Sequence, residues 1–154
     1  MSPPPFQTFL DRHRDAVYRF LVFSVGPDDA DDCLQETFTA ALRAYPRLED
    51  GSNLRAWVLT IAHRKAIDAH RGRARRPVPA AELPEQPVPA PTLPDPGLWK
   101  AVGELPPKQR AAIVLRFVSD LSFRDVGRIL DTSEAAARQN VREGLAHLRK
   151  EYAE

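Results

Sequence analysis

Proline is concentrated in one internal segment of this chain, and that concentration limits the folds the chain can adopt. Eight of the 15 prolines fall within residues 77–97, PVPAAELPEQPVPAPTLPDPG. Because proline lacks a backbone N–H and fixes φ, such a segment cannot continue a helix or a central strand. The sequence therefore predicts two modules, residues 1–76 and 98–154, joined by an extended linker.

The two modules are small and weakly basic, whereas the linker is acidic. Residues 1–76 carry 12 basic and 10 acidic side chains, residues 98–154 carry 10 and 8, and the linker carries three acids and no base. The formal net charge of the 154 residues is only +1. If the protein binds a polyanion, it must therefore do so through local patches of basic side chains, because its net charge produces little electrostatic attraction. Modules of 76 and 57 residues lie near the lower size limit for a self-sufficient core.

The composition argues against several functional classes. One cysteine, Cys33, cannot form an internal disulfide, and the four scattered histidines show no zinc-ligand spacing. The N-terminus has no signal-peptide core, and the most apolar stretch, AVYRFLVFSV, is short and interrupted by Arg19. There is also no glycine-rich phosphate loop and no nucleophile elbow. We therefore expect a cytoplasmic protein without membrane insertion, bound metal, cofactor or enzymatic activity.

Every long periodic segment has helical spacing and none alternates as a strand does, so the predicted fold class is all-α. The second predicted helix begins in the acidic residues 28–36 and stops before Pro46, and the third runs from Leu54 to about Arg76. On the third helix, Trp57 is interpreted as core rather than as a base-stacking platform. The predicted buried stripe of the second helix is Cys33, Leu34, Phe38, Ala41, Leu42 and Tyr45.

The C-terminal module has the spacing of a helix-turn-helix. In LSFRDVGRIL, Ser122 is the expected N-cap, and Asp125 is placed to return the bond in a capping box. Asp131 is expected in the left-handed region at the turn, and Ser133 is expected to cap the second helix. That helix would bury Val141, Leu145 and Leu148 and would point Glu134, Arg138, Gln139 and Arg142 outward.

Two charged segments each have an ordinary structural explanation beside a functional one. DDADDCLQE, residues 28–36, has five carboxylates in nine positions. They can complement the positive end of a helix dipole or form a contact face for another protein, but Glu36 lies too far into the helix for the first explanation. The basic segment RKAIDAHRGRARR, residues 64–76, is either a solvated helix end or a phosphate-binding surface.

Long stretches of both modules resemble one family. DADDCLQETFTAALRAY followed by LRAWVLTIAHRKAIDAHRGRARR resembles region 2 of bacterial RNA polymerase sigma factors, and LPPKQRAAIVLRFVSDLSFRDVGRILDTSEAAARQNVREGLAHLRK resembles region 4. The chain has no room for the other regions, so the resemblance is to the minimal extracytoplasmic-function (ECF) class. The sequence departs from the family pattern at four positions: His63 replaces Asn, Asp131 replaces Gly, and Asn140 and Glu143 replace basic residues.

This resemblance implies a transcription initiation factor that binds core RNA polymerase and directs it to promoters. It implies that the acidic helix docks on the clamp coiled coil of the largest polymerase subunit, with Asp32, Gln35 and Glu36 as the expected contact face. The other expected partners are promoter DNA and, where one exists, an anti-sigma factor. The rival interpretation is a freestanding helix-turn-helix regulator that binds an operator as a dimer, which leaves the N-terminal module unexplained.

The resemblance also implies two DNA sites. Region 2 would take the minus-ten element and capture an unstacked base near the loop EDGSN. The expected residues are Ser52 and Asn53 for base edges, Arg55, Arg64, Lys65 and Arg71 for phosphates, and His63, which either bonds a base or closes the core edge. Region 4 would take the minus-thirty-five element through Ser133, Glu134, Arg138, Gln139 and Arg142, with Arg138 as the base reader.

Overall fold

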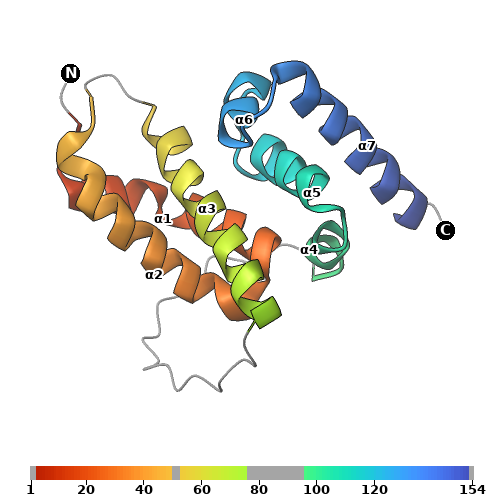
Figure 1. Cartoon of the computed structure of the whole chain (residues 1–154), viewed down its shortest axis with the longest axis horizontal. Coiled ribbons are helices and arrows are strands. Elements are labelled where there is room, and N and C mark those ends of the chain that lie inside the picture. Colours follow the sequence, from red (N-terminus) through yellow and green to blue (C-terminus); the bar gives the residue numbers. More distant parts are fainter. Residues whose placement is uncertain (1–2, 50–52, 76–95, 153–154) are drawn as a thin grey trace.

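The structure is a computed structural model that describes residues 3–49, 53–75 and 96–152, and every regular element in these ranges is helical (Figure 1). The predicted all-α fold class is confirmed. The N-terminal unit contains α1 (Phe6–Val25), α2 (Pro27–Ala44), the short 3-10 turn η1 (Tyr45–Arg47) and α3 (Leu54–Arg75). The C-terminal unit contains α4 (Pro96–Gly103), α5 (Pro107–Ile113), the π-helical turn η2 (Val114–Val118), α6 (Phe123–Ile129) and α7 (Glu134–Tyr152).

The N-terminal unit is a three-helix bundle in which α1, α2 and α3 pack pairwise. Gly26, at φ 88°, ends α1, and Pro27 begins α2 at a position where its missing N–H costs nothing. Phe9 is fully buried, and its ring centre lies 5.2 Å from that of Tyr45 and 5.7 Å from that of Trp57. Trp57 therefore packs against the core, as the sequence predicted.

The predicted buried stripe of α2 is wrong at one position. Leu42 is 54% exposed, whereas Thr37, which the apolar pattern did not include, is fully buried. The Thr37 hydroxyl donates to the Cys33 carbonyl at 2.7 Å, so its polar group is satisfied inside the bundle. Burying Thr37 along with Cys33, Phe38 and Ala41 leaves Leu42 on the solvent side of α2.

The C-terminal unit packs α5 and α6 against the long helix α7. Gly144 allows the close approach of α7 to α5, because a Cβ at this position would lie 2.3 Å from Ile113 Cδ1. The first helix of this unit, α4, begins at Pro96, two residues before the boundary at 98 that the sequence suggested.

The two units contact each other through α1 with α4 and η2, and through α3 with α6. Their buried apolar residues form one continuous cluster rather than two separate cores. The last five residues of α1 are all buried, because this end of the helix lies between the N-terminal bundle and the C-terminal unit. None of the described helices is long and apolar enough to cross a membrane. The described residues also contain no group of His, Cys, Asp or Glu side chains arranged to hold a metal ion.

Candidate polymerase and nucleic-acid interfaces

The exposed side of α2 brings together the three residues expected to contact polymerase. Asp32, Gln35 and Glu36 are all exposed and are spaced by three and four residues, so they share one face of the helix. Leu42 follows Gln35 by seven residues and extends the same face with an exposed apolar side chain. We call Asp32, Gln35, Glu36 and Leu42 the α2 face.

The carboxylates of the α2 face influence the titration of a neighbouring thiol. Burial raises the pKa of Cys33 to about 11, and the nearby charges of Glu36 and Asp32 add to that rise. Within the described part of the chain, neither carboxylate is engaged in an ion pair. Both are therefore available to a cationic partner.

The start of α3 is occupied by contacts with the C-terminal unit. Asn53 caps α3 by accepting a bond from the Ala56 N–H at 3.1 Å, and its side-chain amide donates to Asp125 Oδ2 at 3.4 Å. Arg55 Nη1 donates to the Ser119 carbonyl, also at 3.4 Å. Two residues expected to meet minus-ten DNA thus contact α6 and the loop before it, while Ser52 lies outside the described residues.

The other expected minus-ten residues on α3 do not form one surface. Arg64 and Arg71 are exposed and lie seven residues apart, on one side of the helix. Lys65 is half-buried, and its carbonyl accepts a weak bond from the Cys33 thiol of α2. His63 and Arg71 both line a cavity between α3 and α5, whereas Arg64 and Lys65 are not among its lining residues.

His63 borders a cavity of about 370 Å³ between α3 and α5. Burial, and to a lesser degree the charge of Arg64, lowers the pKa of His63. The ring lies edge-on to Phe20, with 6.5 Å between centres. The remaining lining residues are Ser24, Ala66, Ile67, His70, Arg71, Pro107, Arg110 and Ala111.

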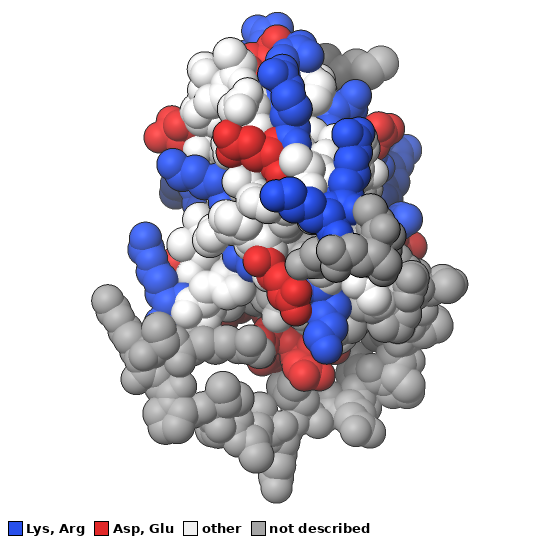
Figure 2. Space-filling view, turned by 90° about the vertical axis from the view of Figure 1, so that its right-hand side faces the viewer, with Lys and Arg blue, Asp and Glu red and all other residues white. Residues whose placement is uncertain are grey.

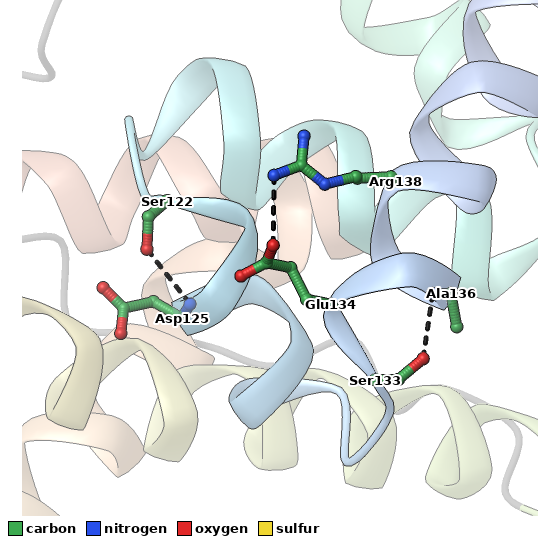
Figure 3. Close-up of polar contacts among 6 residues, drawn as sticks. All are labelled: Ser122, Asp125, Ser133, Glu134, Ala136 and Arg138. Carbon is green, nitrogen blue, oxygen red and sulfur yellow. Dashed lines mark hydrogen bonds and ion pairs between the residues drawn. The ribbon is translucent and has the colours of Figure 1, made fainter.

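The helix-turn-helix consists of α6, a tight turn and α7 (Figure 3). Both predicted caps are confirmed: Ser122 Oγ accepts from the Asp125 N–H at 3.1 Å, and Ser133 Oγ accepts from the Ala136 N–H at 3.0 Å. Asp131 has φ 54°, as expected for the turn. The expected return bond of the capping box is wrong, because the Asp125 carboxylate instead accepts from Asn53 across the two units.

The first half of α7 presents four of the expected minus-thirty-five residues to solvent. Glu134, Arg138, Gln139 and Arg142 are exposed, and Figure 2 shows lysine and arginine side chains gathered on this side of the molecule with a few acids between them. Arg138 pairs with Glu134 at 3.1 Å. The fifth expected residue, Ser133, serves as the cap.

Glu143 binds two side-chain amides. It accepts from Gln139 at 3.0 Å and from Gln109 of α5 at 3.2 Å. Glu143 therefore links α7 to α5 and holds the Gln139 side chain along the axis of α7. By contrast, Arg142 makes no hydrogen bond or ion pair within the described residues.

An aromatic contact beside α7 was not predicted from the sequence. The Arg138 guanidinium carbon lies 4.4 Å from the centre of the Phe123 ring, and that of Arg116 lies 4.9 Å from the same centre. The Phe123 ring is also partly buried against the hydrophobic core. Sequence spacing gives no sign of this contact, because the three residues come from η2, α6 and α7.

Comparisons with known proteins agree with this architecture of a three-helix unit followed by a helix-turn-helix unit. Residues 9–76 match the family model for Sigma-70 region 2, and residues 97–148 match that for Sigma-70, region 4. RNA polymerase sigma factor CarQ of Myxococcus xanthus is 31% identical over 94% of this chain and 87% of its own length. ECF RNA polymerase sigma factor ShbA of Streptomyces griseus is 34% identical over 80% of this chain and 73% of its own.

The architecture also matches a solved structure. The sigma factor RpoE of Bartonella quintana, crystallised with the anti-sigma factor NepR, has a TM-score of 0.79 and 25% identity, over 94% of both chains. Modules of these two kinds in this order define a promoter-directing transcription initiation factor. The chain belongs to the sigma-70 family of RNA polymerase sigma factors, and within it to the ECF class.

Proposed function

We propose that the chain binds the clamp coiled coil of the largest subunit of core RNA polymerase through Asp32, Gln35 and Glu36. The observation that carries this proposal is the exposure of all three on one side of α2, with both carboxylates unpaired among the described residues. Glu36 lies in the third turn of α2, so the helix dipole does not explain its position. Carboxylates on such a face attract a basic partner and repel misplaced DNA.

The two modules would then divide promoter recognition between them. Residues 1–76 bind the minus-ten element, residues 98–154 bind the minus-thirty-five element, and residues 77–97 connect them. On α3, the exposure of Arg64 and Arg71 on one side supports phosphate contacts by these two residues. On α7, the exposure of Arg138 near the capped N-terminus supports base reading in the major groove.

We also propose that the chain catalyses no reaction, because the polymerase forms the phosphodiester bonds. The proposed site of action is the cytoplasm. An anti-sigma factor is a further proposed partner, supported by the RpoE–NepR complex. A freestanding helix-turn-helix regulator is not favoured, because such a protein has no use for a module that matches Sigma-70 region 2.

The proposed clamp contact is tested by reversing one charge of the α2 face. Glu36→Lys should weaken copurification with core polymerase by about tenfold or more, because it places a cation against a basic surface. Asp15→Lys, which makes the same charge change at an exposed site on α1, serves as the matched control. If folded Glu36→Lys protein retains core polymerase as well as the control does at the same salt concentration, the α2 face is not the contact.

A further inference from the structure

The Phe123 ring lies against two arginines from different elements of the helix-turn-helix unit. Arg116 of η2 is fixed there because its Nη1 also donates to the Leu121 carbonyl at 3.1 Å. Arg138 of α7 reaches across toward the start of α6, and Figure 3 shows the Glu134 carboxylate meeting it on the way. Arg138 is thus held from two directions, by a ring face and by an ion pair one helical turn before it.

These two contacts leave most of the Arg138 guanidinium free. A guanidinium has five N–H donors in a planar fork, and the Glu134 bond uses one hydrogen of Nη2. Stacking on Phe123 occupies a ring face and uses no donor. Enough donors remain for a bidentate contact with guanine O6 and N7.

Holding the side chain also changes what DNA binding costs. A free arginine loses considerable rotamer entropy when it is fixed on a base, and a side chain already held in one orientation loses less. Each contact alone is weak, since the pair is exposed and the ring is half-buried. Acting together on one guanidinium, they restrict both its position and its plane.

We infer that Phe123 and Glu134 are positioning residues for base recognition, and that they orient Arg138 for one base pair of the minus-thirty-five element. This inference rests on the proposed base-reading role of Arg138. Glu134 has a second effect, because its charge repels nearby phosphates. Removing that charge therefore raises affinity for every duplex while lowering the discrimination that Arg138 provides.

The test uses holoenzyme assembled from the full-length chain and core polymerase. A promoter fragment is first selected by run-off transcription, and binding is then measured to duplexes with each single base change in its minus-thirty-five element. Phe123→Leu should reduce the discrimination at the base pair read by Arg138 by about two- to fivefold, as expected for loss of one exposed cation–π contact. Phe123→Tyr, which keeps the ring, should restore it. Phe117→Leu, the same change at a 56% exposed phenylalanine of η2, is the matched control.

A second measurement needs no DNA. In the free full-length chain, the Arg138 Nε–Hε NMR signal should carry a ring-current shift that is lost in Phe123→Leu and kept in Phe123→Tyr and Phe117→Leu. It should also show slow side-chain motion that becomes faster in Glu134→Gln.

The results distinguish the positioning role of Phe123 and Glu134 from the base-reading role of Arg138. If Arg138→Ala weakens all duplexes uniformly, the base-reading role fails, and the positioning role in recognition fails with it. If Arg138→Ala flattens the preference at one base pair while Phe123→Leu and Glu134→Gln leave that preference intact, only the positioning inference is overturned. An Arg138 signal unaffected by Phe123→Leu overturns it as well.

Discussion

At the scale of single residues, the environment of His63 makes stability depend on pH. Burial first, and the charge of Arg64 second, lower the pKa of His63 in the folded chain. The folded state then binds fewer protons than the unfolded state, so the free energy of unfolding falls as the pH drops below the unfolded pKa of about 6.5. This loss continues until the pH reaches the lower folded pKa.

Replacing His63 with asparagine, whose side chain does not titrate, removes this proton-linked loss. We expect the urea midpoint of His63→Asn to fall less than that of the parent chain between about pH 7.5 and about pH 5.5. His147→Asn, at an exposed histidine of α7, is the control. Equal losses in His63→Asn and the parent over this range would contradict the assigned environment.

Residues whose roles are set by their neighbours in sequence were predicted well. Ser122 and Ser133 cap their helices and Asp131 adopts the left-handed region, because each depends on a few adjacent backbone groups. The bond from Asn53 to Asp125 and the contact of Arg138 with the Phe123 ring were not predictable, because both depend on how different helices pack.

At the scale of elements, the turn between α6 and α7 depends on close backbone contact at Gly127. A Cβ at this position would lie 2.9 Å from the Thr132 carbonyl oxygen and 3.2 Å from Ser133 backbone atoms, which cannot move aside as a side chain can. We expect Gly127→Ala to lower the free energy of unfolding by about 1–3 kcal/mol, despite the better helix propensity of alanine.

Gly72→Ala is the matched control for that measurement, because nothing lies within 4 Å of its added Cβ on α3. It should leave stability unchanged or raise it by up to about 1 kcal/mol. Chemical unfolding of the full chain gives both values. A Gly127→Ala protein as stable as Gly72→Ala would show that the turn relaxes without cost.

Helix boundaries were largely predictable, whereas the orientation of a helix was not. Pro27 and Pro46 bracket α2 within a few residues of the predicted limits, because proline acts on the local backbone. The exposure of Leu42 depends on the direction from which α1 and α3 pack on α2. An apolar stripe indicates that a face is buried but does not fix its edges.

At the scale of the whole molecule, the described units are in contact, although the proposed DNA sites are far apart. Asn53 and Arg55 of the N-terminal unit bond to Asp125 and Ser119 of the C-terminal unit. Promoter elements two and a half helical turns apart lie about 85 Å from each other. Binding both elements therefore requires these contacts to break and the units to separate.

We propose that the linker limits how far they separate. The 19 residues before α4, 77–95, would reach about 59 Å at a polyproline rise of about 3.1 Å, and the two units would supply the remaining distance. Deleting about half of residues 77–97 should abolish transcription from a two-element promoter, while scrambling the same residues at constant proline content should not. Normal initiation by the shortened chain would mean that the linker does not span the two sites.

The central claim is that this chain gives core polymerase its promoter specificity through two DNA elements. Run-off transcription with purified core polymerase, the purified chain and genomic promoter fragments tests it most directly. We predict transcripts from defined start sites only when the chain is present, with loss of the transcript when either the minus-ten or the minus-thirty-five element is changed. Tight, sequence-specific binding of the same fragments by the chain alone, with no transcript beyond that of core polymerase, would contradict the account and indicate a freestanding regulator.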